Sequence, residues 1–195
     1  MRQLIKNLRK SGALILDTET TGLDNRAEIV QIGIVSLDGS ELFNSLVQPA
    51  KARRWPDATQ VHGITWSGVK DAPTMGQLAD ELKQVMDGRL IAIYNAEFDT
   101  RMLRQSIRAA GATDEYQWLL DQAWEWECVM EAYAEYWGER NRRYGGYRWQ
   151  SLINAWRQQG LRVSNAHSAL GDAKLTAALI RKIEKKFSHG PDGAA

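Results

Sequence analysis

The hydrophobic positions along the chain first separate into short aliphatic runs, which predict strands. These runs have few polar interruptions, as is typical of strands buried on both faces of a sheet. Asp38-Gly39 lies between the second and third runs and is a strong hairpin signal, so these two strands are expected to be antiparallel. The expected strands are residues 14–19, 29–37, 42–47 and 90–94.

Apolar residues that recur every three or four positions predict helices. Glycines at the ends of three such segments mark helix ends. The expected helices are residues 1–10, 74–86, 97–110, 149–159 and 168–186. In the last of these, the spacing predicts a buried stripe formed by Ala173, Thr176, Ala177, Ile180 and Ile183.

The remaining segments are less regular. Residues 49–64 are expected to form a loop, and residues 140–148 a second loop that is basic and contains glycine. Residues 114–138 favour helix, with 126–130 as an alternative short edge strand. Three meandering strands followed by helices that alternate with short strands predict an α/β fold, in which helices cover a mixed sheet.

Length and composition limit the possible classes of protein. At 195 residues the chain suits one domain, expected to span residues 1–187 with a frayed tail at 188–195. The net charge of +1 gives no general affinity for nucleic acid, so any such contact has to be local. Cys128 is the single cysteine, which excludes an internal disulfide and fits a cytoplasmic protein. We expect no signal peptide and no membrane partner, because no apolar segment is long enough.

Candidate chemistry begins where the first strand ends. Asp17 and Glu19 follow the aliphatic run, and residues two apart on a strand share a face. Two carboxylates held together repel each other and lose solvation unless a cation lies between them. This strand alone leaves two interpretations open, a divalent metal site or a polar strand end that meets solvent.

Two further segments place acids at helix starts. Asp99 is in the first turn of the helix that follows strand 90–94, where the helix dipole alone also favours an acid. His167 and Asp172 are five residues apart, about 140° around a helix, so they would not share one helix face. The pair fits one site only if His167 lies on the loop before the helix and Asp172 in its first turn. A histidine there is suited to accept a proton from water near neutral pH.

The joint pattern favours the metal interpretation. Four acids and a histidine all fall at predicted strand ends or helix starts. Carboxylate oxygens suit Mg²⁺ or Mn²⁺ better than zinc, which prefers histidine and cysteine. Two such ions about 4 Å apart can stabilise both the attacking and the leaving oxygen in phosphodiester hydrolysis.

The motifs that carry these residues resemble those of the DEDDh 3′–5′ exonucleases, a family with the ribonuclease H-like fold. The resemblance extends to the proofreading exonuclease subunits of bacterial DNA polymerase III. Its motifs are Asp17-Thr18-Glu19-Thr20-Thr21-Gly22, Val61-His62-Gly63-Ile64, Asn95-Ala96-Glu97-Phe98-Asp99 and His167-Ser168-Ala169-Leu170-Gly171-Asp172-Ala173. It implies a mixed five-stranded sheet, with three antiparallel strands first and short parallel strands after them, flanked by helices.

The resemblance also implies roles for matching positions. It implies two Mg²⁺ or Mn²⁺ ions held by Asp17, Glu19, Asp99 and Asp172, with His167 as the general base. The positions implied to contact the terminal nucleotide are Thr20, Leu23, His62, Ile64, Asn95 and Phe98. Core packing is the alternative for Leu23, Ile64 and Phe98, and helix capping is the alternative for Asn95.

The implied activity is removal of nucleoside 5′-monophosphates from single-stranded 3′ ends, with DNA favoured over RNA. Trimming of RNA ends or of oligonucleotides, internal cutting of the ribonuclease H type and a non-catalytic binding module are the alternatives. A homodimer and a polymerase or repair partner are both compatible with the sequence. The chain ends soon after the last helix, so we expect no long C-terminal tether to a polymerase. The role of the segment Arg53-Arg54-Trp55-Pro56 stays open between gripping the substrate and covering the core, and Trp149 is the tryptophan best suited to contact nucleic acid.

Overall fold

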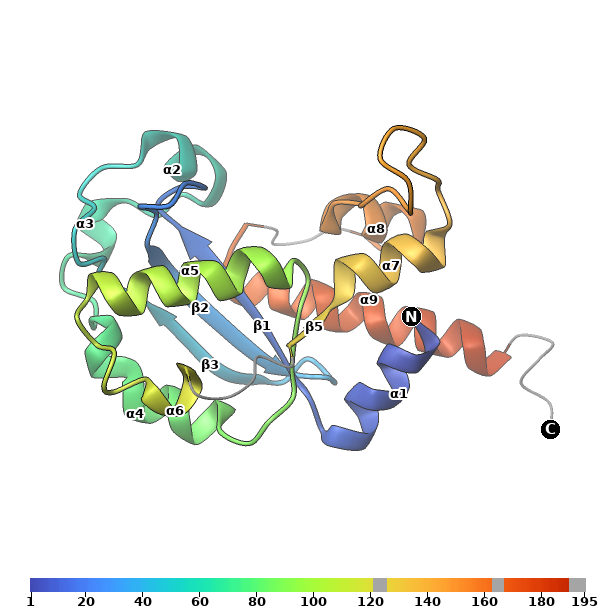
Figure 1. Cartoon of the computed structure of the whole chain (residues 1–195), viewed down its shortest axis with the longest axis horizontal. Helices are drawn as coiled ribbons and strands as arrows, with labels where there is room; N and C mark the ends of the chain where they lie inside the picture. The colour runs from blue at the N-terminus through green and yellow to red at the C-terminus, as the bar shows by residue number, and fades with distance from the viewer. Residues whose placement is uncertain (121–125, 163–166, 190–195) are drawn as a thin grey trace.

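The computed structural model describes residues 1–120, 126–162 and 167–189, and its centre is a five-stranded mixed sheet (Figure 1). The strand order is β3-β2-β1-β4-β5. The first three strands are antiparallel to one another, and β4 and β5 run parallel to β1. The strands are β1 (Leu14–Thr20), β2 (Ile29–Ser36), β3 (Glu41–Leu46), β4 (Ile91–Ile93) and β5 (Trp126–Cys128). The expected α/β fold and the arrangement of its sheet are confirmed.

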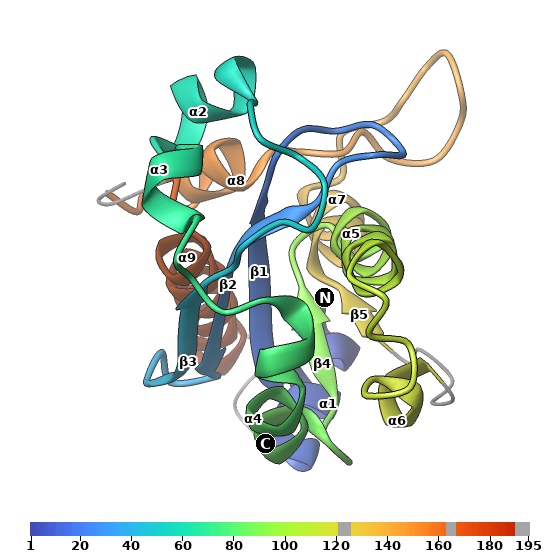
Figure 2. The same ribbon diagram turned by 90° about the vertical axis from the view of Figure 1, so that its left-hand side faces the viewer.

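Helices cover both faces of this sheet. The long strands β1 and β2 alternate between the two faces, with Leu14 and Leu16 packed in one apolar cluster and Ile15 in the other. Helices α4 (Met75–Met86) and α5 (Ala96–Ala109) pack in the first cluster. The second cluster contains residues of α1 (Arg2–Ser11), α7 (Val129–Trp137), α8 (Leu152–Gln158) and α9 (Ala169–His189). Figure 2 shows α9 and α5 on opposite sides of β1.

The helices with a clear apolar stripe were predicted well. In α9 the five expected stripe residues are all buried, at 0–1% exposure. Helix α4 begins with a capping box, in which Thr74 and Gln77 exchange hydrogen bonds. Helix α9 continues through Ser188 and His189, two residues into the expected tail, and residues 190–195 lie outside the described part of the chain.

Two expectations were wrong in detail, and one open alternative was decided. Residues 49–64 are not only a loop, because α2 (Pro56–His62) forms after Trp55, with Pro56 in its first turn, and α3 (Trp66–Val69) follows. Helix α8 starts after Ser151 and not at Trp149, because the Ser151 side chain accepts a hydrogen bond from the Asn154 amide and caps the helix. Residues 126–128 form β5, so the strand alternative was correct there, between the short α6 (Gln117–Leu120) and α7. The expected helical segment at residues 121–125 lies outside the described residues.

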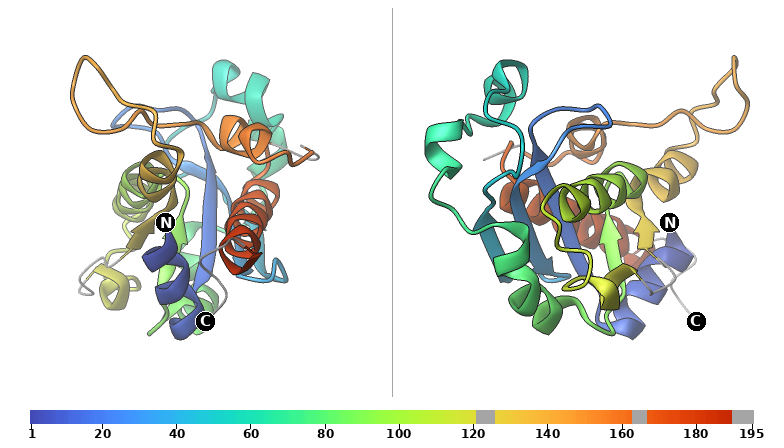
Figure 3. Two further views of the ribbon diagram at one scale, coloured as in Figure 1. Left: turned by 90° about the vertical axis from the view of Figure 1, so that its right-hand side faces the viewer. Right: turned by 60° about the vertical axis from the view of Figure 1, so that its left-hand side comes forward.

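Two excursions extend the fold beyond the sheet and its helices. One is the α2–α3 segment, which packs around a small apolar cluster with Trp55 and Val69. The other is residues 139–149 between α7 and α8, which project from the body of the molecule in both views of Figure 3. The described helices include none with the length and hydropathy needed to cross a bilayer.

Candidate active site

Three carboxylates converge at the carboxyl-terminal half of β1. Asp17 and Glu19 point to the face of the sheet that α9 covers, and Asp172 comes from the first turn of α9. One ligand oxygen from each residue lies within 4.8 Å of the others, and all three residues are partly buried. The structure therefore brings together three of the four acids that the sequence placed in one site.

Two residues of β2 bring α9 close enough for Asp172 to join this cluster. Gly33 pairs with Asp17 across the ladder, and a Cβ atom at Gly33 would lie 2.4 Å from the Leu170 nitrogen. Gln31 pairs with Glu19, and its side-chain oxygen accepts a hydrogen bond of 3.1 Å from the Ala169 amide. The start of α9 therefore packs directly against β2, beside the part of β1 that carries the two acids.

Asp99 approaches β1 from the opposite layer. It is only 4% exposed in the first turn of α5, and Thr18 points toward it because Thr18 alternates with Asp17 and Glu19 along the strand. The Oδ1 atom of Asp99 accepts hydrogen bonds from the Thr18 amide at 3.1 Å and from the Thr18 hydroxyl at 2.7 Å. Asp99 is therefore fixed beside the three-carboxylate cluster but is not one of its three members.

Burial raises the pKa values of all four acids, and repulsion by the other acids raises those of Asp17 and Glu19 further. Burial and the charges of Asp99, Asp172 and Glu19 raise the pKa of Asp17 well above its ordinary value. Burial and the charges of Asp172 and Asp99 raise the pKa of Glu19 to about 8, and burial raises the pKa of Asp99 to about 7. Burial also raises the pKa of Asp172, partly offset by His167. Buried carboxylates that repel one another are the oxygen ligands that Mg²⁺ and Mn²⁺ prefer, so the donor set fits a divalent cation.

His167 lies on the segment just before α9, as the spacing to Asp172 predicted. Its backbone amide donates a hydrogen bond of 3.4 Å to Asp172 Oδ1, and its side chain is exposed. Its φ angle of 73° is the one left-handed angle of a non-glycine residue in the described chain. A left-handed backbone at this position turns the residue out of the helix that follows.

A pocket of about 600 Å³ lies next to the acids. Its lining includes four of the six expected substrate positions, Thr20, Leu23, His62 and Phe98. Leu23 is 78% exposed, so the alternative of core packing is wrong for this residue. Phe98 is partly buried against the first apolar cluster and also lines the pocket, so the two interpretations are not exclusive.

Ile64 and Asn95 lie outside the lining of this pocket. The Ile64 side chain packs against the small cluster beneath α2, and its carbonyl oxygen accepts a hydrogen bond from the Trp55 ring. Asn95 occupies the N-cap position of α5, as the alternative of helix capping required, but its side chain makes no capping bond.

His62 joins α2 to the end of β1. Its Nδ1 atom accepts a hydrogen bond from the Ile64 amide at 3.0 Å, so the proton is on Nε2, which donates to the Thr20 carbonyl at 3.1 Å. Burial lowers the pKa of His62, and the ring is expected to be neutral. With both nitrogens engaged, His62 is held in place in the wall of the pocket.

The segment of Arg53 and Trp55 packs over a small apolar cluster, and Trp55 and Pro56 also line the pocket beside the acids, so the two alternatives for this segment are not exclusive. Trp55 is 5% exposed, and Arg53 stacks over the Trp66 ring at 4.3 Å. The segment is tied to β2 by Glu28, a buried acid whose carboxylate accepts hydrogen bonds from the amides of Ala50, Lys51 and Ala52. No sequence pattern around Glu28 predicts this role. A glycine inside an apolar strand, by contrast, is a signal of close backbone approach that could have identified Gly33.

Comparisons with known proteins agree with this geometry. The family model RNase_T, described as Exonuclease, matches residues 14–180. An uncharacterized exonuclease, CP81 of Escherichia phage 186, is 35% identical over 185 residues, which cover 94% of this chain and 93% of that protein. The DNA polymerase III subunit epsilon of Rickettsia conorii is 33% identical over 107 residues, 52% of this chain and 46% of that protein. The structure of Exonuclease X in complex with 5′ overhanging duplex DNA is similar with a TM-score of 0.64 and 27% identity, over 90% of this chain and 93% of that one.

Proposed function

The chain belongs to the RNase_T exonuclease family and is a metal-dependent 3′–5′ exonuclease of the DEDDh type, and from this premise we propose that it trims single-stranded 3′ ends of DNA with two divalent ions. The observation that carries the proposal is the cluster of Asp17, Glu19 and Asp172 beside the pocket that Leu23 and His62 line. DNA is favoured because Exonuclease X, a similar protein over nearly its whole length, was solved with DNA. We also propose that residues 1–187 act as one exonuclease domain.

In this proposal Asp17, Glu19 and Asp172 hold Mg²⁺ or Mn²⁺, and Asp99 completes the acidic set from the α5 side. Such ions, when bound, supply positive charge for the phosphodiester and for the attacking water. His167 accepts the proton of that water from its exposed position before α9. An oxygen–phosphorus bond forms, the bond from phosphorus to the 3′ oxygen breaks, and that oxygen takes a proton from solvent. The products are a nucleoside 5′-monophosphate and a strand one nucleotide shorter.

The pocket residues hold the strand end in position for this step. The exposed Leu23 side chain offers an apolar surface to the last base, and the Phe98 ring lies in the same lining. His62 fixes the Thr20 carbonyl and with it the turn that carries Leu23. No base-reading hydrogen bond is needed for this arrangement, which fits low sequence specificity.

A test of the function compares three 5′-labelled substrates of one sequence: single-stranded DNA, duplex DNA with a mismatched 3′ end, and RNA. We expect a ladder of products that shorten by one nucleotide, fastest on single-stranded DNA, which stops when EDTA removes the metal. Large discrete fragments would indicate internal cutting, and a faster ladder on RNA would assign the enzyme to RNA ends. Absence of any cleavage with Mg²⁺ and Mn²⁺ would leave a non-catalytic binding module.

The role of His167 predicts a slow variant with an intact metal site. We choose His167→Asn, because asparagine tolerates the left-handed backbone better than alanine and cannot accept a proton near neutral pH. The rate should fall by roughly 10²–10⁴-fold, and the residual rate should rise with hydroxide concentration, since solvent replaces the missing base. The stabilisation by Mg²⁺ in thermal unfolding should remain. A rate and pH dependence equal to those of the wild type would contradict the role of base.

The role of Leu23 predicts weaker substrate binding without loss of stability. Because Leu23 is 78% exposed, Leu23→Ala should change the free energy of unfolding by less than about 0.5 kcal/mol. Loss of its contact with the terminal base should raise KM roughly 5–30-fold. Leu42→Ala is the matched control, since Leu42 is also exposed, at 43%, but lies on β3. Equal KM values for both variants would exclude Leu23 from the binding site.

A further inference from the structure

Residues 139–149, here called the arginine arm, form a hairpin-like projection that the exonuclease site does not include. Its outgoing and returning chains are joined by a hydrogen bond of 2.8 Å from the Arg148 amide to the Glu139 carbonyl and by a bridge between Arg140 and Tyr147. At its end, Gly145 and Gly146 have positive φ angles of 75° and 66°, which allow the chain to reverse.

The end of the arginine arm has a defined shape. The side-chain oxygen of Asn141 accepts hydrogen bonds from the amides of Arg143 and Tyr144, both at 3.1 Å. The Gly145 amide donates to the Asn141 carbonyl at 3.0 Å. These bonds use only backbone groups of Arg143 and Tyr144, so the turn does not depend on either side chain.

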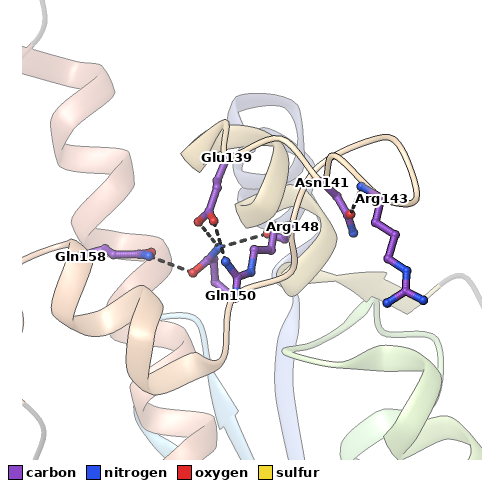
Figure 4. Close-up of polar contacts among 6 residues, drawn as sticks. All are labelled: Glu139, Asn141, Arg143, Arg148, Gln150 and Gln158. Atoms are coloured by element: carbon purple, nitrogen blue, oxygen red, sulfur yellow. Dashed lines mark hydrogen bonds and ion pairs between the residues drawn. The ribbon is translucent and has the colours of Figure 1, made fainter.

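The base of the arginine arm is anchored in the body of the molecule, as Figure 4 shows. Glu139 accepts hydrogen bonds from Arg148 at 2.9 Å and from the buried Gln150 at 3.1 Å. Gln150 in turn accepts a hydrogen bond of 2.9 Å from Gln158 of α8, and its carbonyl oxygen accepts one from the Tyr94 hydroxyl at 2.7 Å. This network holds the arm in one direction relative to the sheet.

The arginine arm concentrates positive charge and exposed aromatic rings. It contains four arginines and one glutamate, a net charge of +3 in a chain whose total charge is +1. A hollow of about 560 Å³ on one side is lined by Glu139, Arg140, Asn141, Arg142, Arg143 and Arg148. Another, of about 490 Å³, is lined by Asn141, Tyr144, Gly145, Tyr147, Arg148 and Trp149. Tyr144 is 76% exposed and Trp149 is 59% exposed.

This composition matches the chemistry of a nucleic-acid strand. Guanidinium groups bind phosphates, and aromatic and guanidinium planes stack on unpaired bases. The Arg143 guanidinium already lies 5.1 Å from the centre of the Tyr144 ring, and Arg140 lies 4.5 Å from that of Tyr147. Exposed rings and cations lie side by side on an anchored base, an arrangement that indicates a binding surface and not merely a solvated loop.

The position of the arginine arm suits a strand that ends in the exonuclease pocket. In Figure 1 α2 lies over the C-terminal end of β1, and the arm rises on the other side, above α7 and α8. His62 and Val61 of α2 line the pocket for the terminal nucleotide. A strand that left this pocket on the side away from α2 would extend toward the side of the molecule that carries the arm.

We infer that the arginine arm binds the sugar–phosphate backbone and unpaired bases of the substrate strand upstream of the 3′ end that is cut. This inference rests on the proposed exonuclease function and adds a second binding region for the same strand. The arm makes no contact with the reacting phosphate, so it affects substrate binding and not the chemical step.

The test removes the two exposed arginines at the end of the arm in the variant Arg142→Ser/Arg143→Ser. Lys6→Ser/Lys10→Ser is the matched control, because it removes the same charge from exposed positions on α1, which lies at the lower edge of Figure 1 while the arm projects from the upper edge. Binding of a labelled, long oligothymidylate is measured by fluorescence anisotropy in EDTA over a range of salt concentrations. Hydrolysis of the p-nitrophenyl ester of thymidine 5′-monophosphate is measured with Mn²⁺, because this substrate has nothing upstream to reach the arm.

We expect the arm variant to raise the Kd of the oligonucleotide roughly tenfold or more and to reduce the slope of log Kd against log salt by about 1.4. The control should leave both unchanged, and all three proteins should hydrolyse the ester equally. If both variants bind the long oligonucleotide as the wild type does, the inference is overturned and the arm serves another partner. Equal losses of affinity in the two variants would also overturn it, because they would show an effect of total charge and not of the arm. Failure of the wild type to hydrolyse any substrate would instead overturn the proposed function. The binding measurements would still test whether the arm binds the oligonucleotide.

Discussion

Asp17→Asn should abolish exonuclease activity and at the same time stabilise the metal-free protein. Asp17 shares one ligand cluster with Glu19 and Asp172, so its loss should lower the rate by about 10³-fold or more. Burial and neighbouring charges raise the pKa of Asp17, which means that the folded protein without metal is destabilised by the ionised carboxylate. An amide of the same shape removes that charge and can donate to a neighbouring carboxylate. We expect a gain of about 1–3 kcal/mol in the free energy of unfolding at pH 8.

The same electrostatics predict how stability varies with pH. A carboxyl group whose pKa is raised by folding binds more protons in the folded than in the unfolded state, so stability is lost as the pH rises through its folded pKa. For Glu19 the loss extends from about 4.5 to about 8. The wild-type protein in EDTA should therefore unfold at a lower temperature at pH 8 than at pH 6, and Asp17→Asn should reduce this difference.

Thermal unfolding in EDTA and in Mg²⁺, together with the trimming assay, checks these expectations. Asp80→Asn is the matched control, since Asp80 is exposed on α4 and the same substitution there removes a charge away from the site. Mg²⁺ should raise the unfolding temperature of the wild type and of the control but not that of Asp17→Asn. Near wild-type activity of Asp17→Asn would remove Asp17 from the site, and a fall in its metal-free stability would contradict the repulsion among the buried carboxylates.

Most of the site could be predicted from the sequence, because local backbone geometry determines where these side chains point. Alternation along a strand places Asp17 and Glu19 on one face, and the position of Asp172 in the first turn of α9 follows from the helix start after Ser168. Asp99 was expected at the same edge, and the structure adds that it approaches from the other layer through Thr18. The face of the sheet from which Asp99 approaches depends on how the helices pack, and this packing cannot be predicted from single residues.

Features that depend on contacts between distant segments were harder to predict from the sequence. Helix α2 follows a segment rich in basic residues and forms because Trp55, at its start, is buried. Glu28, which anchors the preceding segment, lies 22 residues from its partner Ala50. The arginine arm has no periodic pattern, and its fixed shape comes from Asn141 and from the network of Gln150 and Gln158. Propensity describes single segments, whereas these elements are defined by pairs of segments.

Gly33→Ala should destabilise the fold and inactivate the enzyme without touching an acid. The added Cβ would lie 2.4 Å from the Leu170 nitrogen and 2.5 Å from the Ala169 carbonyl carbon, both backbone atoms that cannot swing aside. Overpacking of this kind costs about 1–3 kcal/mol, so the unfolding temperature should fall by several degrees. The shift moves the first turn of α9, and with it Asp172, away from Asp17. Because a displacement of about 1 Å can cost 10²-fold in rate, activity should fall by about that factor.

Gly76→Ala is the matched control and should have the opposite effect on stability. Gly76 is the second residue of α4, where a Cβ atom would meet Ala112 Cβ at 3.8 Å, an ordinary contact. Alanine in a helix is favoured over glycine by about 0.5–1 kcal/mol, so this variant should unfold at a higher temperature with unchanged activity. Assays of Gly33→Ala well below its unfolding temperature separate misplacement of Asp172 from loss of folded protein. A folded Gly33→Ala enzyme with the wild-type rate would show that catalysis does not require the close seat of α9 on β2.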